Sequence, residues 1–117
     1  MNPETKIQRA ILLALSSAGC TVFRCETGNF WTGRVIHHAG DQVTLSSAQM
    51  IPCGLTKGGS DIIGWTSDGR FLAVEVKTEK GRATKEQLRF IDAVNNSGGV
   101  AGVCRSPEEA IQLISRQ

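Results

Sequence analysis

The strongest constraint on the fold of this chain is a pair of apolar segments, residues 61–66 and 70–77, on either side of Ser67-Asp68-Gly69. An Asp-Gly pair between two short β-type runs is a strong local signal for a β-hairpin. Both segments are apolar at odd and at even positions. They are therefore predicted to be central strands of a sheet that is covered on both faces.

The length of the hairpin loop decides which side chains share a face. A two-residue loop would set Asp61 opposite Val76 and send Glu75 to the other face. A three-residue loop, a type I turn followed by Gly69 in the left-handed region, would set Asp61 opposite Glu75. In that register, which we predict, Lys77 lies on the same face as the two carboxylates.

Two carboxylates and a lysine at the end of a buried hairpin are expensive to keep charged, because desolvation and like charge both raise carboxyl pKa values. A divalent cation would resolve this conflict. Carboxylate oxygens, a backbone carbonyl and waters are the ligands that Mg²⁺ prefers. A lysine beside the metal can hold or deprotonate an attacking water and offset charge on a phosphate. The alternative is a cross-strand Asp–Lys pair, or strand ends that face solvent.

The other elements follow from capping and periodicity. Helices are expected to begin after Asn2, Thr84 and Ser106, each a favourable N-cap, and the first two end before glycines. Further strands are expected at residues 21–25 and 100–104, with an inserted hairpin over residues 30–37 and 42–45 and a Gly-rich loop over residues 50–59. Trp65 is expected in the core. The predicted fold is one α/β domain, a mixed sheet with helices on both faces.

Composition excludes several classes of protein. The 117 residues are 40% hydrophobic and 21% charged, which is typical of a folded domain, and no apolar run reaches the length of a membrane span. We find no secretory signal and expect a cytoplasmic location. The four cysteines form no C-x-x-C pair, so a zinc site is not expected. No Walker or Rossmann glycine pattern indicates a nucleotide cofactor.

Basic charge is concentrated in one stretch. The net charge is +2 overall, whereas residues 70–89 carry six basic against three acidic side chains. A local excess of this kind suits a polyanion such as DNA, or is simply the solvated face of a helix and loop.

The motifs at residues 58–64, 73–77, 87–90 and 98–100 together resemble the PD-(D/E)XK nuclease superfamily. They are most similar to its virus-type replication-repair nuclease (VRR-NUC) branch, in particular the compact phage and prophage members. The resemblance implies a restriction-endonuclease-like fold and an endonuclease dependent on Mg²⁺ or Mn²⁺. It also implies a homodimer that cuts four-way (Holliday) DNA junctions in a host cell. Ser60 departs from the proline of the superfamily motif.

The resemblance also assigns roles to residues. It implies that Asp61 and Glu75 bind the metal, that Val76 offers its carbonyl oxygen, and that Lys77 is the catalytic lysine. Gln87 matches a helix position that faces the site in the family, although Thr84 to Gln87 also forms a capping box. Glu4 matches an acidic position near the metal, although it also suits a helix N-terminus.

Candidate DNA contacts lie around this site and on the inserted hairpin. They are Lys57, Lys80, Arg82, Lys85 and Arg34. The inserted hairpin carries more aromatic and β-branched residues than the core needs, which suggests a DNA-binding arm or an interface with a second subunit.

Three functions compete at this point. The first is a metal-dependent endonuclease that acts on branched DNA. The second is a DNA-binding or assembly module of the same fold, which would have no reason to keep two carboxylates beside a phosphate. The third is a metal-dependent phosphatase or nucleotide hydrolase, which the missing phosphate-binding glycine patterns disfavour.

Overall fold

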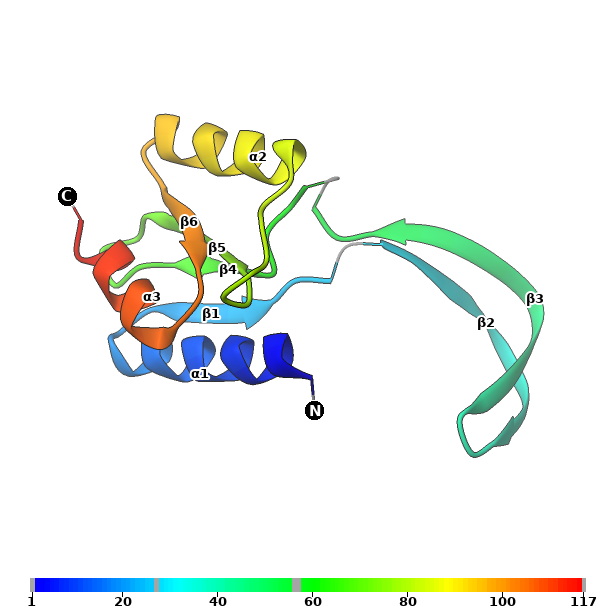
Figure 1. Cartoon of the computed structure of the whole chain (residues 1–117). Coiled ribbons are helices and arrows are strands. Elements are labelled where there is room, and N and C mark those ends of the chain that lie inside the picture. Colours follow the sequence, from blue (N-terminus) through cyan, green and yellow to red (C-terminus); the bar gives the residue numbers. More distant parts are fainter. Residues whose placement is uncertain (1, 27, 56–57, 117) are drawn as a thin grey trace.

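The chain folds into a body of three helices and four strands, from which a long two-stranded arm projects (Figure 1). The computed structural model describes residues 2–26, 28–55 and 58–116. The elements in chain order are α1 (Pro3–Ser17), β1 (Thr21–Arg24), β2 (Gly28–Ala39), β3 (Gln42–Cys53), β4 (Ile62–Trp65), β5 (Phe71–Val76), α2 (Lys85–Asn96), β6 (Val100–Cys104) and α3 (Pro107–Ile114). Within the described residues, no helix is both long and apolar enough to cross a membrane.

The hairpin β4–β5 has the register that the three-residue loop predicts. Ile62 pairs with Val74, and the pairing runs without a shift to the loop. The Gly69 amide donates to the Thr66 carbonyl oxygen at 2.9 Å, and Gly69 has a φ of +85°, in the left-handed region that favours glycine. The turn chemistry of the sequence therefore fixed which side chains of the two strands share a face.

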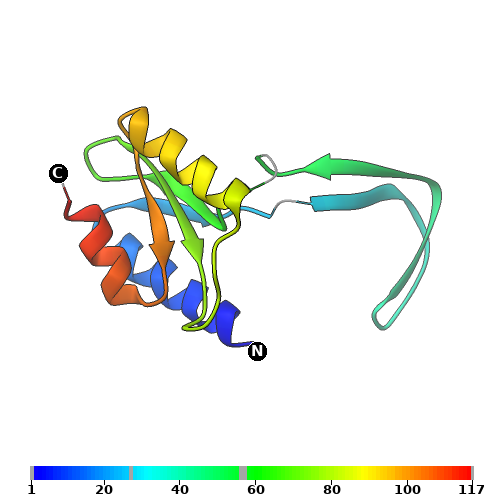
Figure 2. The same ribbon diagram turned by 45° about the horizontal axis from the view of Figure 1, so that its top comes forward.

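The body is a mixed sheet in the order β1-β4-β5-β6 between two layers of helix. Pairing is antiparallel from β1 through β5, and β5 pairs with β6 in parallel. A parallel neighbour requires a crossover connection, which α2 supplies. Helices α1 and α3 cover one face and α2 covers the other, as Figures 1 and 2 show from two directions. The α/β fold with helices on both faces is confirmed.

Two apolar clusters hold these layers together, and they follow the alternation of side chains along the strands. On the α1 and α3 face, Leu72, Val74 and Val76 are fully buried against residues of the two helices. On the α2 face, Ala73 packs with residues of α2 and β6. Strand β5 is buried on both sides, as its unbroken apolar sequence predicted.

The helices begin at the predicted caps. The Asn2 side chain accepts from the Thr5 amide at 2.8 Å, and the Ser106 hydroxyl accepts from the Glu109 amide at 3.1 Å. At α2 the capping box is complete. The helices are placed correctly from sequence because capping depends on side chains a few positions away.

The arm, residues 28–53, is longer than the sequence predicted. Strands β2 and β3 have twelve residues each, so residues 50–53 belong to a strand and not to the expected loop. Irregularities in the register lie between Thr32 and Arg34 and between Val35 and His37. Pro52 is tolerated because both strands of a two-stranded ribbon are edges. Bulges and exposure of both faces obscure the alternation from which strands are recognised.

The expectation that Trp65 lies in the core is wrong, since this side chain is 48% exposed. Helix α2 packs mainly over β5 and β6. Ile63 of β4 reaches the apolar cluster under α2, whereas Trp65, at the other end of β4, is not part of that cluster. There Trp65 contacts Phe23 of β1 edge to face, with ring centres 6.5 Å apart. Apolar sequence on both faces of β4 did not reveal where the covering helix would end.

Candidate active site

The candidate site lies where β5 ends and β4 begins. Asp61 immediately precedes β4, and its main-chain oxygen accepts from the Cys25 amide at 2.7 Å. Its carboxylate accepts from the Val76 amide at 2.9 Å, across the hairpin. Both the backbone and the side chain of Asp61 are thus held against the ends of neighbouring strands.

Glu75 is the buried centre of the site. Its side chain is 2% exposed, and one carboxylate oxygen, Oε1, accepts from the Gln87 side-chain amide at 2.9 Å. The ammonium of Lys77 lies 3.7 Å from the same oxygen. The register of β4 and β5 puts Asp61 on this face as well. The structure therefore brings together Asp61, Glu75, Lys77 and Gln87, as predicted.

The surroundings of Glu75 raise its pKa to about 8. Burial is the largest cause, because it penalises the charged form. The nearby negative charge of Asp61 adds to the shift, Glu4 adds a smaller contribution, and Lys77 opposes it. One ammonium is thus insufficient to balance the carboxylates gathered at this end of the sheet.

The second oxygen of Glu75, Oε2, is buried without a hydrogen-bond partner among the described residues. A buried carboxylate oxygen of this kind is costly unless a further group binds it. The Val76 amide points toward Asp61, whereas the Lys77 amide donates to the Cys104 carbonyl oxygen of β6. Since N–H and C=O of one strand residue point to the same neighbour, the Val76 carbonyl also faces the side of Asp61.

This donor set fits a hard divalent cation. Asp61, Glu75 and the Val76 carbonyl offer oxygen ligands, and Mg²⁺ completes its shell with waters. No group of three His, Cys, Asp or Glu side chains within the described ranges is arranged to hold a metal by itself. A cation here would accordingly depend on two carboxylates, a backbone carbonyl and water.

Gln87 fills both of the roles that its sequence position allowed. The side-chain oxygen of Gln87 accepts from the backbone amide of Thr84 at 2.8 Å. The backbone amide of Gln87 donates to the Thr84 hydroxyl at 3.1 Å. That capping box leaves the side-chain NH₂ free to donate to Glu75. The cap thus orients the amide group toward the site.

Glu4 approaches the site from the first turn of α1. With Asp61 it lines a polar pocket of about 230 Å³, together with Asn2, Thr5, Gln8, Arg24 and Glu26. Sequence reasoning did not select Gln8. The signal was present, since Gln8 lies four positions after Glu4 and therefore on the same side of the helix.

The candidate DNA contacts have different positions. Lys80, Arg82 and Lys85 are exposed on the connection from β5 to α2 and at the start of α2, beside the site in the chain. Arg34 is exposed on β2, on the part of the arm that projects away from the body (Figure 1). Lys57 lies outside the described residues.

Comparisons with known proteins agree with this geometry. The family model described as the VRR-NUC domain matches residues 37–108, which include Asp61, Glu75, Lys77 and Gln87. A solved structure titled "VRR_NUC domain" is similar over 99% of this chain and 98% of that chain, with a TM-score of 0.60 and 17% sequence identity. At that identity the likeness concerns the fold. No curated protein matches the chain.

Proposed function

Since the chain belongs to the VRR-NUC family, a family of nuclease domains, we propose that it is a metal-dependent endonuclease that cuts branched DNA. Family membership implies a nuclease-type DNA-processing module. The proposal adds Mg²⁺ or Mn²⁺ as cofactor, hydrolysis of phosphodiester bonds as reaction, and four-way junctions as preferred substrate.

The observation that carries the proposal is the buried, half-satisfied carboxylate of Glu75. A pure binding module would gain nothing from burying this group beside Asp61, because it raises the cost of folding and repels phosphate. The same arrangement is useful if a cation occupies it. We therefore favour an enzyme over a DNA-binding module of the same fold.

The side chains then divide the work. Asp61, Glu75 and the Val76 carbonyl would hold the cation, which supplies Lewis acidity toward a phosphate oxygen. Lys77 would hold the attacking water and stabilise negative charge that develops on the phosphate. Gln87 would fix the orientation of Glu75, and Glu4 would add negative charge at the entrance. Lys80, Arg82 and Lys85 would bind flanking phosphates.

The shape of the chain supports assembly into a homodimer. It exposes 7772 Å², whereas a compact chain of 12.6 kDa exposes about 6,200 Å². Its radius of gyration is 16.4 Å, against about 13 Å expected for its length. The excess area of about 1,600 Å² on one chain is about twice the roughly 800 Å² that each partner buries in a standard protein interface.

The arm, which projects from the body in Figure 1, is the proposed interface. An isolated two-stranded ribbon is marginally stable in water. The arm also holds half of the large exposed apolar side chains of the described residues: Phe30, Trp31, Val35, Ile36, Val43, Met50 and Ile51. Its charged side chains are Arg34 and Asp41, which cancel, so phosphate contacts would be few. A two-fold dimer would place two sites for symmetric cutting of a junction.

The test is cleavage by purified protein of linear, flapped, splayed and four-way DNA of matched sequence, with Mg²⁺, Mn²⁺ or EDTA. We expect cleavage with either metal, none with EDTA, and preference for the four-way junction. Light scattering at micromolar concentration is expected to give twice the chain mass. Equal cutting of linear and four-way DNA would refute the substrate preference, and activity in EDTA would refute the metal requirement.

A further inference from the structure

The connection between β5 and α2 lies directly against Lys77. We call residues 78–83 the strap. They follow Lys77 in the chain and end just before Thr84, the N-cap of α2. The strap begins with a tight turn in which the Gly81 amide donates to the Thr78 carbonyl oxygen at 3.1 Å. A methyl group added to Gly81 would lie 3.4 Å from Cδ and 3.5 Å from Cβ of Lys77. The turn therefore packs on the aliphatic stem of the lysine.

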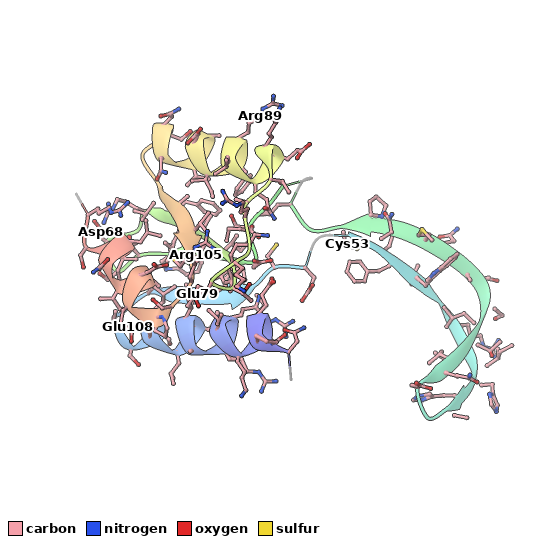
Figure 3. All side chains as sticks on the ribbon, in the orientation of Figure 1. Cys53, Asp68, Glu79, Arg89, Arg105 and Glu108 are labelled. Atoms are coloured by element: carbon pink, nitrogen blue, oxygen red, sulfur yellow. The ribbon has the colours of Figure 1, made fainter. Side chains whose placement is uncertain are left out.

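Arg105 also binds this turn. It follows β6, and its Nη1 atom donates to the Thr78 carbonyl oxygen at 2.7 Å and to that of Gly81 at 2.6 Å. Both carbonyls are more than twenty residues away in the chain. Figure 3 shows Arg105 in the body beside Glu79 of the strap. One guanidinium thus closes the turn by binding its first and last carbonyl groups.

Arg105 is itself fixed by the start of α3. Its backbone amide donates to the Glu109 carboxylate at 2.7 Å, and the Glu109 amide donates to the Ser106 hydroxyl. The contacts therefore form one series from the cap of α3 through Arg105 and the strap to the stem of Lys77. At its end, the Lys77 ammonium lies 3.7 Å from Glu75, with the lysine side chain 17% exposed.

We propose that Arg105 is a positioning residue, which holds the strap against Lys77 and so fixes the lysine ammonium beside Glu75. The inference rests on the proposed catalytic role of Lys77. It assigns Arg105 no contact with DNA, because the donors that the structure shows are directed at strap carbonyls. The loss of Arg105 would thus slow the chemical step without weakening substrate binding.

The kinetic test compares Arg105→Ala and Arg105→Lys with the unchanged protein on four-way DNA. Arg105→Ala is expected to lower kcat at least tenfold while KM changes less than threefold. Arg105→Lys, which keeps the charge and can still donate to a carbonyl, is expected to recover part of kcat. Arg116→Ala is the control, since it removes one positive charge from an exposed position beyond α3.

A second readout needs neither metal nor DNA. In EDTA, the rate at which acetic anhydride labels each lysine is measured by mass spectrometry. Arg105→Ala is expected to raise the labelling rate of Lys77 several-fold and leave exposed Lys6 of α1 unchanged. If the unchanged protein cuts no DNA, the proposed function fails, yet this measurement still decides whether Arg105 restrains Lys77.

Three results would overturn the inference. A rise in KM with kcat unchanged would make Arg105 a DNA contact. A rise in Lys77 labelling accompanied by a large fall in the thermal unfolding temperature would indicate general loosening of the fold. Unchanged kcat and labelling would exclude any role. Should Arg105→Ala fail to fold, Gly81→Val tests the same contact, because its branched side chain meets the Lys77 stem and is expected to lower kcat and raise Lys77 labelling.

Discussion

Hairpins β4–β5 and β2–β3 belong to one chain, yet β5 is almost completely buried, whereas every residue of β2 is exposed. Both are antiparallel, and both have a glycine with positive φ in the turn, Gly69 and Gly40. The buried hairpin keeps a regular register, whereas the exposed one is interrupted by irregularities. Local turn chemistry therefore makes a hairpin in either setting.

What differs is the physical use of the strands. Burial of both faces of β5 gives it a fixed environment in which Glu75 is held almost entirely out of solvent and with a raised pKa. The arm has no such environment, and its apolar side chains face solvent. This difference supports the proposal that the buried hairpin carries the chemistry and that the exposed one is an interface.

The largest expected difference between the hairpins is in cleavage. Asp61→Asn, Glu75→Gln and Lys77→Ala are each expected to lower kcat by a factor on the order of 10²–10³ or more, because each removes a group to which the proposed function assigns metal binding or stabilisation of the reacting groups. Circular dichroism and DNA binding in EDTA should be retained. The matched control is Asp41→Asn at the tip of the arm. Full activity in any of the three site variants would refute the site.

In stability, truncation of an apolar side chain to alanine should separate the two hairpins. Leu72→Ala in the core is expected to lower the free energy of unfolding by about 2–5 kcal/mol, because it leaves a cavity. Val35→Ala on the arm should change it by less than about 0.5 kcal/mol. Urea denaturation over a range of protein concentrations measures both and separates unfolding from dissociation. Equal losses would mean that the arm is part of the body's folding unit.

The raised pKa of Glu75 predicts how stability depends on pH without metal. Below about pH 4.5 the carboxyl is protonated in both states and adds no penalty. As pH rises from there to about 8, the unfolded chain releases the proton more readily, so the folded state loses stability. Thermal unfolding in EDTA should show this decline, and Mg²⁺ should reverse it. Glu75→Gln should remove most of this dependence of stability on pH. If the decline between about pH 4.5 and 8 is unchanged in the variant, it arises from other groups.

The smallest expected effect distinguishes the two turns. A methyl group at Gly69 or at Gly40 would meet nothing within 4 Å, so alanine there adds backbone strain of about 1 kcal/mol. Gly69→Ala should lower the stability of the body by this amount, whereas Gly40→Ala should leave it unchanged. Fluorescence of Trp65 in a Trp31→Phe background reports the body alone. If Gly40→Ala lowered the stability measured by Trp65 fluorescence, the arm and the body would unfold together.

The sequence by itself determined the local features of this protein. Ser67-Asp68-Gly69 predicted the turn, and the turn predicted that Asp61 and Glu75 share a face. The N-caps predicted where the helices begin, and the apolar sequence of β5 predicted that it is buried on both sides. These predictions hold because turns, caps and side-chain alternation depend on residues only a few positions apart.

The tertiary structure decided the features that depend on distant parts of the chain. It set the limit of α2 over the sheet and so exposed Trp65, and it left β2 and β3 without neighbours in the body. It also placed Gln87 on Glu75 and Arg105 on the strap, contacts that span twelve and more than twenty residues. Such contacts follow from how whole elements pack, which the short-range pattern of a sequence does not encode.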